Sequence, residues 1–259
     1  MTPQIPGYVL SFESILRPVV TLIALGLIWL GAARMPASTK SRYTTAGVLS
    51  VVFIGWEAVA QYLGAANTYL ATIENPPAVP TILFGLLIPL AVAAIGLWQS
   101  ESIARLVSAI PLHWLVAAQV YRVAGGIFLV LWADGRLPWQ FALPAGIGDV
   151  TTGIVAVVVA ALLARNAIGA HRATYAWCLF GIADLVVAIT MGAMTSPGRA
   201  HLLAFDAPNL LVTAYPLVMV PTFAGPLALM LHGLVLLRLR RGAEATGRLA
   251  AAATGQKRT

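Results

Sequence analysis

Four ionisable residues, Glu57, Arg122, Asp149 and Asp184, lie inside long stretches of sequence that are otherwise apolar. An ionised side chain near the centre of a bilayer is costly, so such residues are rare, face other protein groups and mark functional sites. Arg122 can neutralise one of the three acids, and at least one remaining carboxyl group is then expected to be protonated near neutral pH. A carboxyl group held in this way can exchange a proton or bind a solute.

The elements that must position these residues are predicted to be membrane helices. Of the 259 residues, 59% are hydrophobic and 10% are charged, whereas soluble domains carry about 25% charged residues. A membrane-spanning segment must satisfy its own backbone hydrogen bonds, which favours an all-α, polytopic membrane protein. Seven transmembrane helices are predicted, over residues 14–34, 43–65, 77–98, 111–133, 144–165, 173–194 and 209–238.

The distribution of basic residues predicts the orientation of these helices. With the N-terminus outside, only Arg17, Arg136 and Arg199 fall on the outer side, and the remaining Lys and Arg residues, apart from Arg122 within a predicted helix, lie inside. Cytoplasmic loops collect Lys and Arg, so we expect the N-terminus outside, the C-terminus in the cytoplasm and the protein in the cytoplasmic (inner) membrane. The net charge of +7 then has a topological origin, and no nucleic-acid partner is expected. Residues 1–241 form the predicted seven-helix domain, and residues 242–259 a flexible cytoplasmic tail.

The faces of the predicted helices suggest that the four ionisable residues form one buried cluster. Asp149 shares a helical face with small residues, including Gly153 and Ala156, and small residues let helices approach closely. Glu57 shares its face with Gln61, and Arg122 with Gln119, while Tyr215 opens a proline-rich stretch. The predicted proton- or solute-binding residues are Glu57, Gln61, Gln119, Arg122, Asp149, Asp184 and Tyr215.

Two pairs of similar segments suggest an internal repeat. PLAVAAIGL at 89–97 resembles PLALMLHGL at 226–234, and each follows a VPT sequence. FIGWEAV at 53–59 also matches FGIADLV at 180–186, which places Glu57 opposite Asp184. The pattern predicts two parallel halves of three helices joined by the helix that carries Arg122, a 3+1+3 arrangement. Proline-interrupted helices in corresponding positions of two halves are typical of transporter binding sites.

Two other interpretations use the same carboxyl groups. In the first, Arg122 and one acid form a structural salt bridge in a non-transporting subunit or sensor. In the second, GIGD at 146–149 resembles the GxGD motif of intramembrane aspartyl proteases of the presenilin and prepilin-peptidase type. The resemblance implies a hydrolase in which two membrane carboxyl groups activate a water molecule. However, the partner Asp184 follows the motif instead of preceding it, and the PAL motif of these families is missing.

A haem-binding redox protein is the remaining alternative, with His113 and His232 as candidate axial ligands in the same leaflet. His113 is half a turn away from Arg122 on its predicted helix, which places it away from the polar cluster. A retinal chromophore is excluded because it needs a membrane lysine, and the lysines are Lys40 and Lys257. The sequence carries no phosphate-binding loop, dinucleotide fingerprint or zinc signature. We therefore predict no cofactor and no metal site.

Together these features favour a small-solute transporter or solute-binding membrane protein over an enzyme. The carboxylate and arginine cluster would bind the solute. The acids that Arg122 does not neutralise could exchange protons and so couple solute binding to proton transfer. The expected partners are the lipid bilayer and a small solute or proton, and the sequence does not determine an oligomeric state.

Overall fold

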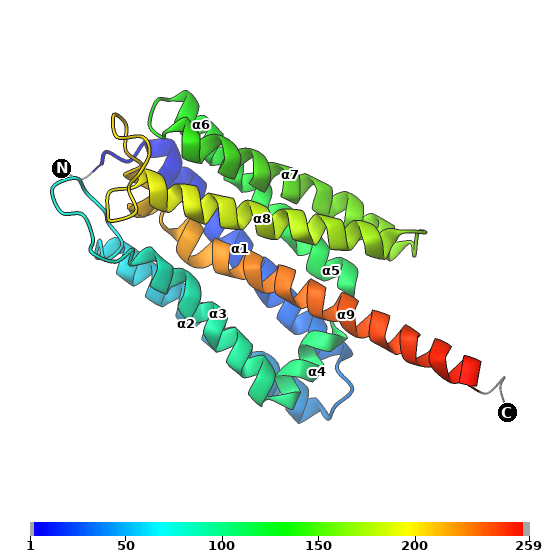
Figure 1. Ribbon diagram of the computed structural model, residues 1–259. Coiled ribbons are helices and arrows are strands. Elements are labelled where there is room, and N and C mark those ends of the chain that lie inside the picture. The colour runs from blue at the N-terminus through cyan, green and yellow to red at the C-terminus, as the bar shows by residue number, and fades with distance from the viewer. Residues whose placement is uncertain (1–2, 256–259) are drawn as a thin grey trace.

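The computed structural model describes residues 3–255, with side chains described as far as Gly242. The described residues form helices and loops without a strand. Seven helices are long and apolar enough to cross a membrane, as predicted, and run alternately up and down the molecule (Figure 1). These spans are Gly7–Arg34, Thr39–Ala65, Ile82–Gln99, Leu112–Ala133, Trp139–Ala164, Ala170–Thr195 and Val220–Gly242. The described part of the protein therefore has the all-helical architecture of a multi-pass membrane protein.

The long helices lie side by side, and the long loops gather at one end, close to the N-terminus (Figure 1). The spans correspond to α1 (Gly7–Arg34), α2 (Thr39–Ala65), α3 (Ile82–Gln99), α7 (Trp139–Ala164), α8 (Ala170–Thr195) and α9 (Gly225–Gly255), with the fourth span built from several pieces. A short helix, α4 (Glu101–Ala109), links the third and fourth spans at the opposite end. The sequence analysis did not predict α4, which is too short to cross a bilayer.

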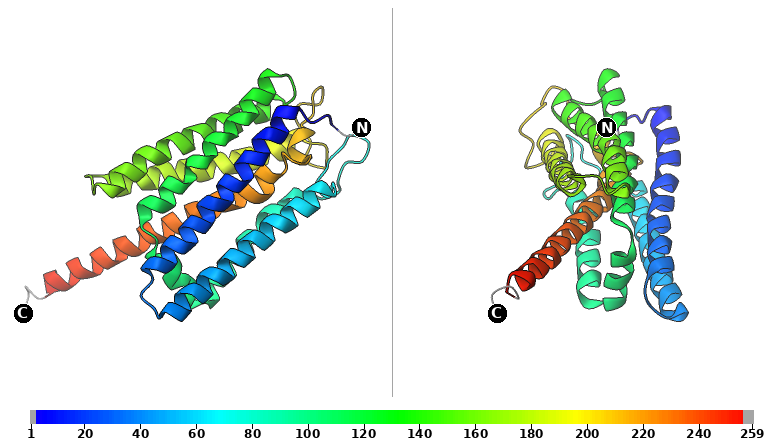
Figure 2. Two further views of the ribbon diagram at one scale, coloured as in Figure 1. Left: turned by 180° about the vertical axis from the view of Figure 1, so that it is seen from behind. Right: turned by 90° about the vertical axis from the view of Figure 1, so that its right-hand side faces the viewer.

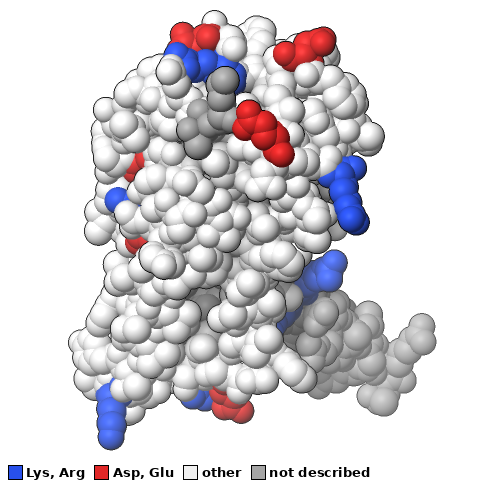
Figure 3. Space-filling model, turned by 90° about the vertical axis from the view of Figure 1, so that its left-hand side faces the viewer, with Lys and Arg blue, Asp and Glu red and all other residues white. Residues whose placement is uncertain are grey.

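Outward-facing side chains are apolar along most of the spans. Charged side chains are few on the face seen in Figure 3, and a broad part of its middle carries none. α2 illustrates the pattern, because Val51 and Tyr62 are exposed while Ala60 and Gly64 are buried. An uncharged surface of this kind suits a hydrocarbon environment, in which apolar side chains face lipid.

The fourth span is not one regular α-helix. It consists of α5 (Leu112–Ala117), a 3₁₀ helix named η1 (Ala118–Gly126) and α6 (Ile127–Ala133). In a 3₁₀ helix, residues three apart lie on the same face. Gln119, Arg122 and Gly125 therefore form one line, and all three are buried. The irregular segment presents this line to α7, α8 and α9.

The last span begins later than predicted. Residues 209–219 contain only the short 3₁₀ helix η2 (Leu211–Thr213) and turns, and a π-helical turn, η3 (Val220–Ala224), precedes α9. Pro216 and Pro221 explain the difference, because each removes a backbone donor and interrupts regular helical hydrogen bonding, whereas Pro226 lies in the first turn of α9, where proline is tolerated. The prediction that this region is broken by prolines is confirmed, and the predicted start of the helix at residue 209 is wrong.

The inward face predicted for α7 is largely confirmed. Thr152, Gly153, Ala156 and Ala160 are buried, whereas Ile154, Val157 and Val158 are exposed. Val159, which was expected to face lipid, is buried among other core residues. α7 packs along α8 and along all three pieces of the fourth span, so its small residues allow close contact on two sides.

The predicted repeat and tail have different outcomes. α8 packs along α9, whereas α2 packs on α1 and α4, so the packing gives no support to two equivalent three-helix halves. α9 continues as a helix to Gly255 and extends beyond the bundle (Figure 2). Residues 242–255 are thus helical, residues 256–259 lie outside the described part of the chain, and the flexibility of the tail stays a prediction.

Candidate functional site

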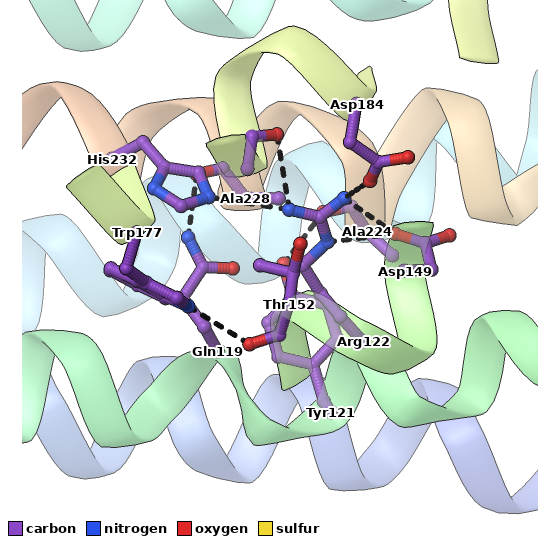
Figure 4. Close-up of polar contacts among 11 residues, drawn as sticks. Gln119, Tyr121, Arg122, Asp149, Thr152, Trp177, Asp184, Ala224, Ala228 and His232 are labelled. Carbon is purple, nitrogen blue, oxygen red and sulfur yellow. Dashed lines mark hydrogen bonds and ion pairs between the residues drawn. The ribbon is translucent and has the colours of Figure 1, made fainter. Parts of the chain in front are cut away.

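Arg122 lies at the centre of a buried polar cluster between η1, α7, α8 and α9 (Figure 4). Its Nε donates to Oδ1 of Asp149 over 2.7 Å, and its Nη2 lies 2.7 Å from the same oxygen. Nη2 also donates to Oδ2 of Asp184. Arg122 was predicted to contact Asp149 or Asp184, and in the structure its guanidinium group bridges both carboxyl groups.

The remaining nitrogen of Arg122 faces α8 and α9. Nη1 donates to the carbonyl oxygen of Gly181 over 3.3 Å and lies 3.2 Å from Nε2 of His232. Because arginine can only donate, Nε2 of His232 must accept, and the imidazole is neutral with its proton on Nδ1. Nδ1 lies 3.3 Å from Sγ of Cys178, which in turn donates to the His232 carbonyl oxygen over 3.3 Å. Five contacts with protein acceptors thus match the five N–H donors of a guanidinium group.

Two side chains on the 3₁₀ helix fix it against the interrupted start of α9. Gln119 donates from Nε2 to the Ala228 carbonyl oxygen over 3.0 Å, and the Tyr121 hydroxyl donates to the Ala224 carbonyl oxygen over 2.8 Å. Gln119 was a predicted site residue, and it lies one 3₁₀ turn from Arg122 without contacting the carboxyl groups. Its contact with backbone shows that it positions the helix that carries Arg122.

Glycines make the close approach of these groups possible. A Cβ atom at Gly148 would overlap the carboxyl group of Asp184, and one at Gly181 would overlap the imidazole of His232. A Cβ atom at Gly125 would overlap Asp149. The second glycine of the GIGD sequence is therefore required by packing, because it leaves room for the carboxyl group of the neighbouring helix.

The cluster forms the inner end of a cavity of about 150 Å³. The cavity lies between α3 and α8, both of which pack on α9, and it extends to the loops at the N-terminal end of the bundle. Arg122 and Asp149 contribute to its lining, and most of the rest of the lining is apolar. The side chain of Asp149 is 14% exposed, compared with 5% for Asp184 and 2% for Arg122. Asp149 is thus the carboxyl group that the cavity reaches.

The outer end of the cavity carries polar groups of a different kind. Tyr69 and Ser196 line it, both are at least nine-tenths buried, and neither hydroxyl group has a hydrogen-bond partner among the described residues. Burial raises the pKa of Tyr69 above its ordinary value, so its hydroxyl group is protonated at neutral pH. Arg199 lies at the rim and is exposed.

Glu57 does not belong to the Arg122 cluster, which corrects the prediction. It lies 3.7 Å from Arg17 and accepts a hydrogen bond of 2.8 Å from Thr21, both on α1. The prediction failed because α2 packs on α1 and α4 instead of on the helices that surround Arg122.

Gln61 and Tyr215 also lie apart from the carboxyl groups. They contact each other, with Nε2 of Gln61 3.4 Å from the tyrosine hydroxyl group. Tyr215 also packs on Gly64, one helical turn along α2 from Gln61. This contact joins α2 to the turn before η3, and neither residue lines the cavity that reaches Arg122.

The site differs from the two cofactor or hydrolase alternatives. Both ring nitrogens of His232 are engaged by protein groups, and His113 is only half-buried and packs against Trp114. An aspartyl-protease pair shares a proton between two carboxyl groups, whereas Arg122 here bridges Asp149 and Asp184. Among the described residues, no group of three His, Cys, Asp or Glu side chains is placed to hold a metal ion.

Several residues of the site were not identified from the sequence. His232 was recognised as an inward-facing membrane histidine and weighed as a haem ligand, but its contact with Arg122 was not predicted, and Cys178 was noted only as the single cysteine. Their contacts with the cluster depend on how α8 and α9 are rotated, which a single apolar sequence does not reveal. Tyr69 and Ser196 lie in the loops that follow α2 and α8. The composition of these loops did not indicate a binding site.

The comparisons with known proteins identify a family without a described activity. No curated protein and no solved structure matches the chain. Residues 78–240 match a family model, and this segment contains Arg122, Asp149, Asp184 and His232 but not Arg17 or Glu57. Because the match covers more than half of the chain, the protein belongs to the family described as "Domain of unknown function (DUF8737)".

Proposed function

We propose that this protein is a small-solute transporter or solute-binding protein of the cytoplasmic membrane, and that the solute occupies the cavity that ends at Asp149 and Arg122. The observation that carries the proposal is the opening of the cluster onto a cavity. A salt bridge with a purely structural role needs no such access, since burial of both partners is enough to fix helix register.

Proton coupling is part of the proposal. Arg122 contacts two carboxyl groups, and His232 is neutral in its contact with the guanidinium group. With both carboxyl groups ionised the cluster would carry a net negative charge, which is costly in an apolar setting. Uptake of a proton or of a positively charged group would remove this charge.

The proposed orientation places the mouth of the cavity outside. The basic residues of the described helix ends and short loops concentrate at the end opposite the mouth, as the positive-inside rule requires of the cytoplasmic side. These residues are Arg34, Lys40, Arg42, Arg105, Arg165, Arg172, Arg238, Arg240 and Arg241. Cysteine labelling in intact cells tests the orientation, with variants Lys40→Cys and Glu74→Cys. Cys178 is buried and should give little background. Labelling of position 74 only from the cytoplasmic side would overturn the orientation.

The solute site is tested by filling the cavity. Ala193 lines it on α8, whereas Ala183 on the same helix is exposed on the outside. We expect Ala193→Leu to abolish solute binding and flux in reconstituted vesicles, and Ala183→Leu, the matched control, to keep both. A screen of small solutes by thermal shift comes first. If no solute binds, or if Ala193→Leu binds as well as wild type, the cluster is structural and the transporter proposal fails.

A further inference from the structure

We propose that the cavity selects a protonated amine carried on a small apolar body, with the ammonium group at Asp149. This inference rests on the proposed function, because it names the class of solute that the same cavity would take. It also predicts that the amine and a proton compete for the carboxyl groups.

The bonding of Arg122 argues against an anionic solute. A guanidinium group would be the natural partner of a carboxylate or phosphate, but all three nitrogens of Arg122 are already engaged by protein acceptors. An anion could reach Arg122 only by displacing Asp149 or Asp184. The cluster therefore has no donor edge left for a solute.

Asp149 offers an acceptor instead. Both contacts with Arg122 use Oδ1, and no described residue donates a hydrogen bond to Oδ2. The residue lines the cavity and is the more exposed of the two aspartates. A group that approaches through the cavity thus meets a carboxylate oxygen, and an ammonium group is the complementary partner.

The balance of charge gives the same answer. One guanidinium group faces two carboxyl groups, so one of the carboxyl groups must carry a proton or meet a second cation for the cluster to be neutral. When the ammonium group of an amine binds, the protonated carboxyl group loses its proton, and one proton leaves for each cation that enters. The other ionisable groups around Asp149 are Arg122, Tyr121, Asp184, His232 and Cys178. Arg199 at the rim is exposed, so solvent screens its repulsion of a cation.

The walls define the rest of the solute. Between its two polar ends the cavity is lined by apolar side chains, including Leu86, Phe128, Phe141, Leu185, Ile189 and Leu229. Its volume of about 150 Å³ is comparable with that of an apolar cavity that binds benzene. A sugar or a free amino acid would lose hydration without gaining partners there. A single hydrocarbon group, such as a phenyl ring, fits the chemistry of the walls.

Two buried hydroxyl groups offer free hydrogen-bonding capacity to a polar group in the cavity. Tyr69 and Ser196 are buried, line its outer part and have no hydrogen-bond partner among the described residues. Buried hydroxyl groups in proteins are nearly always hydrogen-bonded, to water or ligand where protein does not serve. Their position near the mouth allows them to replace part of the hydration of the entering ammonium group.

The test uses three probes that share a phenyl ring and differ in charge: phenethylamine, phenethyl alcohol and phenylacetate. Binding to the full-length protein in nanodiscs is measured by calorimetry at several pH values. We expect phenethylamine to bind most tightly. In buffers that differ in ionisation enthalpy, its binding should release one proton. In the pH range where the competing carboxyl group is protonated, the affinity of the protein for phenethylamine should increase about tenfold for each unit by which the pH is raised. These measurements need only the wild-type protein.

Variants locate the contact. Asp149→Asn should weaken phenethylamine binding by about 10- to 100-fold, the usual contribution of a hydrogen bond to a charged group. Glu57→Gln, which changes a membrane acid outside the cavity, should bind like wild type. Tighter binding of phenylacetate or phenethyl alcohol would overturn the amine inference while the proposed function stands. Amine binding without proton release would overturn the competition between amine and proton. Failure of all three probes to bind would overturn both the amine inference and this competition.

Discussion

Among the described residues, two arginine–carboxylate groups lie within the membrane spans, and they differ in burial and in the number of their contacts. Arg122 is 2% exposed at its side chain and contacts two aspartates, a histidine and a backbone carbonyl group. Arg17 is 28% exposed and lies 3.7 Å from a single partner, Glu57, which is 17% exposed. A charged residue in an apolar helix is therefore a candidate binding residue when it lines a cavity and has a hydrogen-bonding atom that no protein group occupies.

The second group has an additional acid nearby. Glu13 lies one helical turn from Arg17 on α1, is buried, and has one carboxyl oxygen without a hydrogen-bond partner among the described residues. Neither Glu13 nor Arg17 nor Glu57 lines the cavity that reaches Asp149. Arg17 and Glu57 also lie outside the segment 78–240 that matches the family model.

The largest contrast is expected from removal of each arginine. Arg122→Met should destabilise the protein by about 3 to 5 kcal/mol, because it leaves two buried carboxyl groups and His232 without their common donor. Arg17→Met should cost about 1 kcal/mol, since it removes a single contact of 3.7 Å and Thr21 still donates to Glu57. Thermal and denaturant unfolding in detergent would compare them. Equal losses would show that the two groups are energetically equivalent, and the comparison would fail.

A smaller contrast is expected from the glycines. Gly148→Ala should destabilise by about 1 to 3 kcal/mol, because the new methyl group meets the carboxyl group of Asp184. Gly55→Ala on α2, where a Cβ atom meets no neighbour, should be neutral or stabilising by up to about 1 kcal/mol. The two variants can be unfolded side by side. A neutral Gly148→Ala would mean that the cluster is looser than its geometry indicates.

The histidines give a third contrast. His232→Gln should cost about 1 kcal/mol, because the amide oxygen can still accept from Arg122 but loses the contact of the ring with Trp177. His113→Gln should change stability by about 0.5 kcal/mol or less at its half-buried position. Nitrogen NMR of labelled histidine would also identify the tautomer of His232. A proton on Nε2 would contradict the assigned contact with Arg122.

The smallest effect is expected where both partners of the outer pair are replaced. The double variant Arg17→Met, Glu57→Leu should unfold within about 1 kcal/mol of wild type, because apolar residues of similar volume often replace an ion pair without loss. Solute binding should also be unchanged, since neither residue lines the cavity. Loss of binding in a stably folded double variant would restore Glu57 to the site, as the sequence analysis had predicted.

The class of fold and part of the cluster could be predicted from the amino-acid sequence. Apolar segments must form helices in lipid because their backbone groups have no other partner, so the seven spans could be predicted from composition and length. The inward face of α7 followed from its small residues, and a contact of Arg122 with Asp149 or Asp184 followed from the cost of leaving a membrane charge unpaired.

Which polar residues share a site depends on how the helices pack and could not be predicted from the sequence. Glu57, Asp149 and Asp184 have the same chemistry in similar apolar surroundings, yet packing of α2 on α1 pairs Glu57 with Arg17, while packing of α7, α8 and α9 around η1 assembles the rest. Hydropathy and helical periodicity predict which face of each helix is buried, but they do not predict which other helix packs on that face. The rotation of α9 that brings His232 to Arg122, and the separation of α3 from α8 that opens the cavity, depend on contacts between residues far apart in the chain.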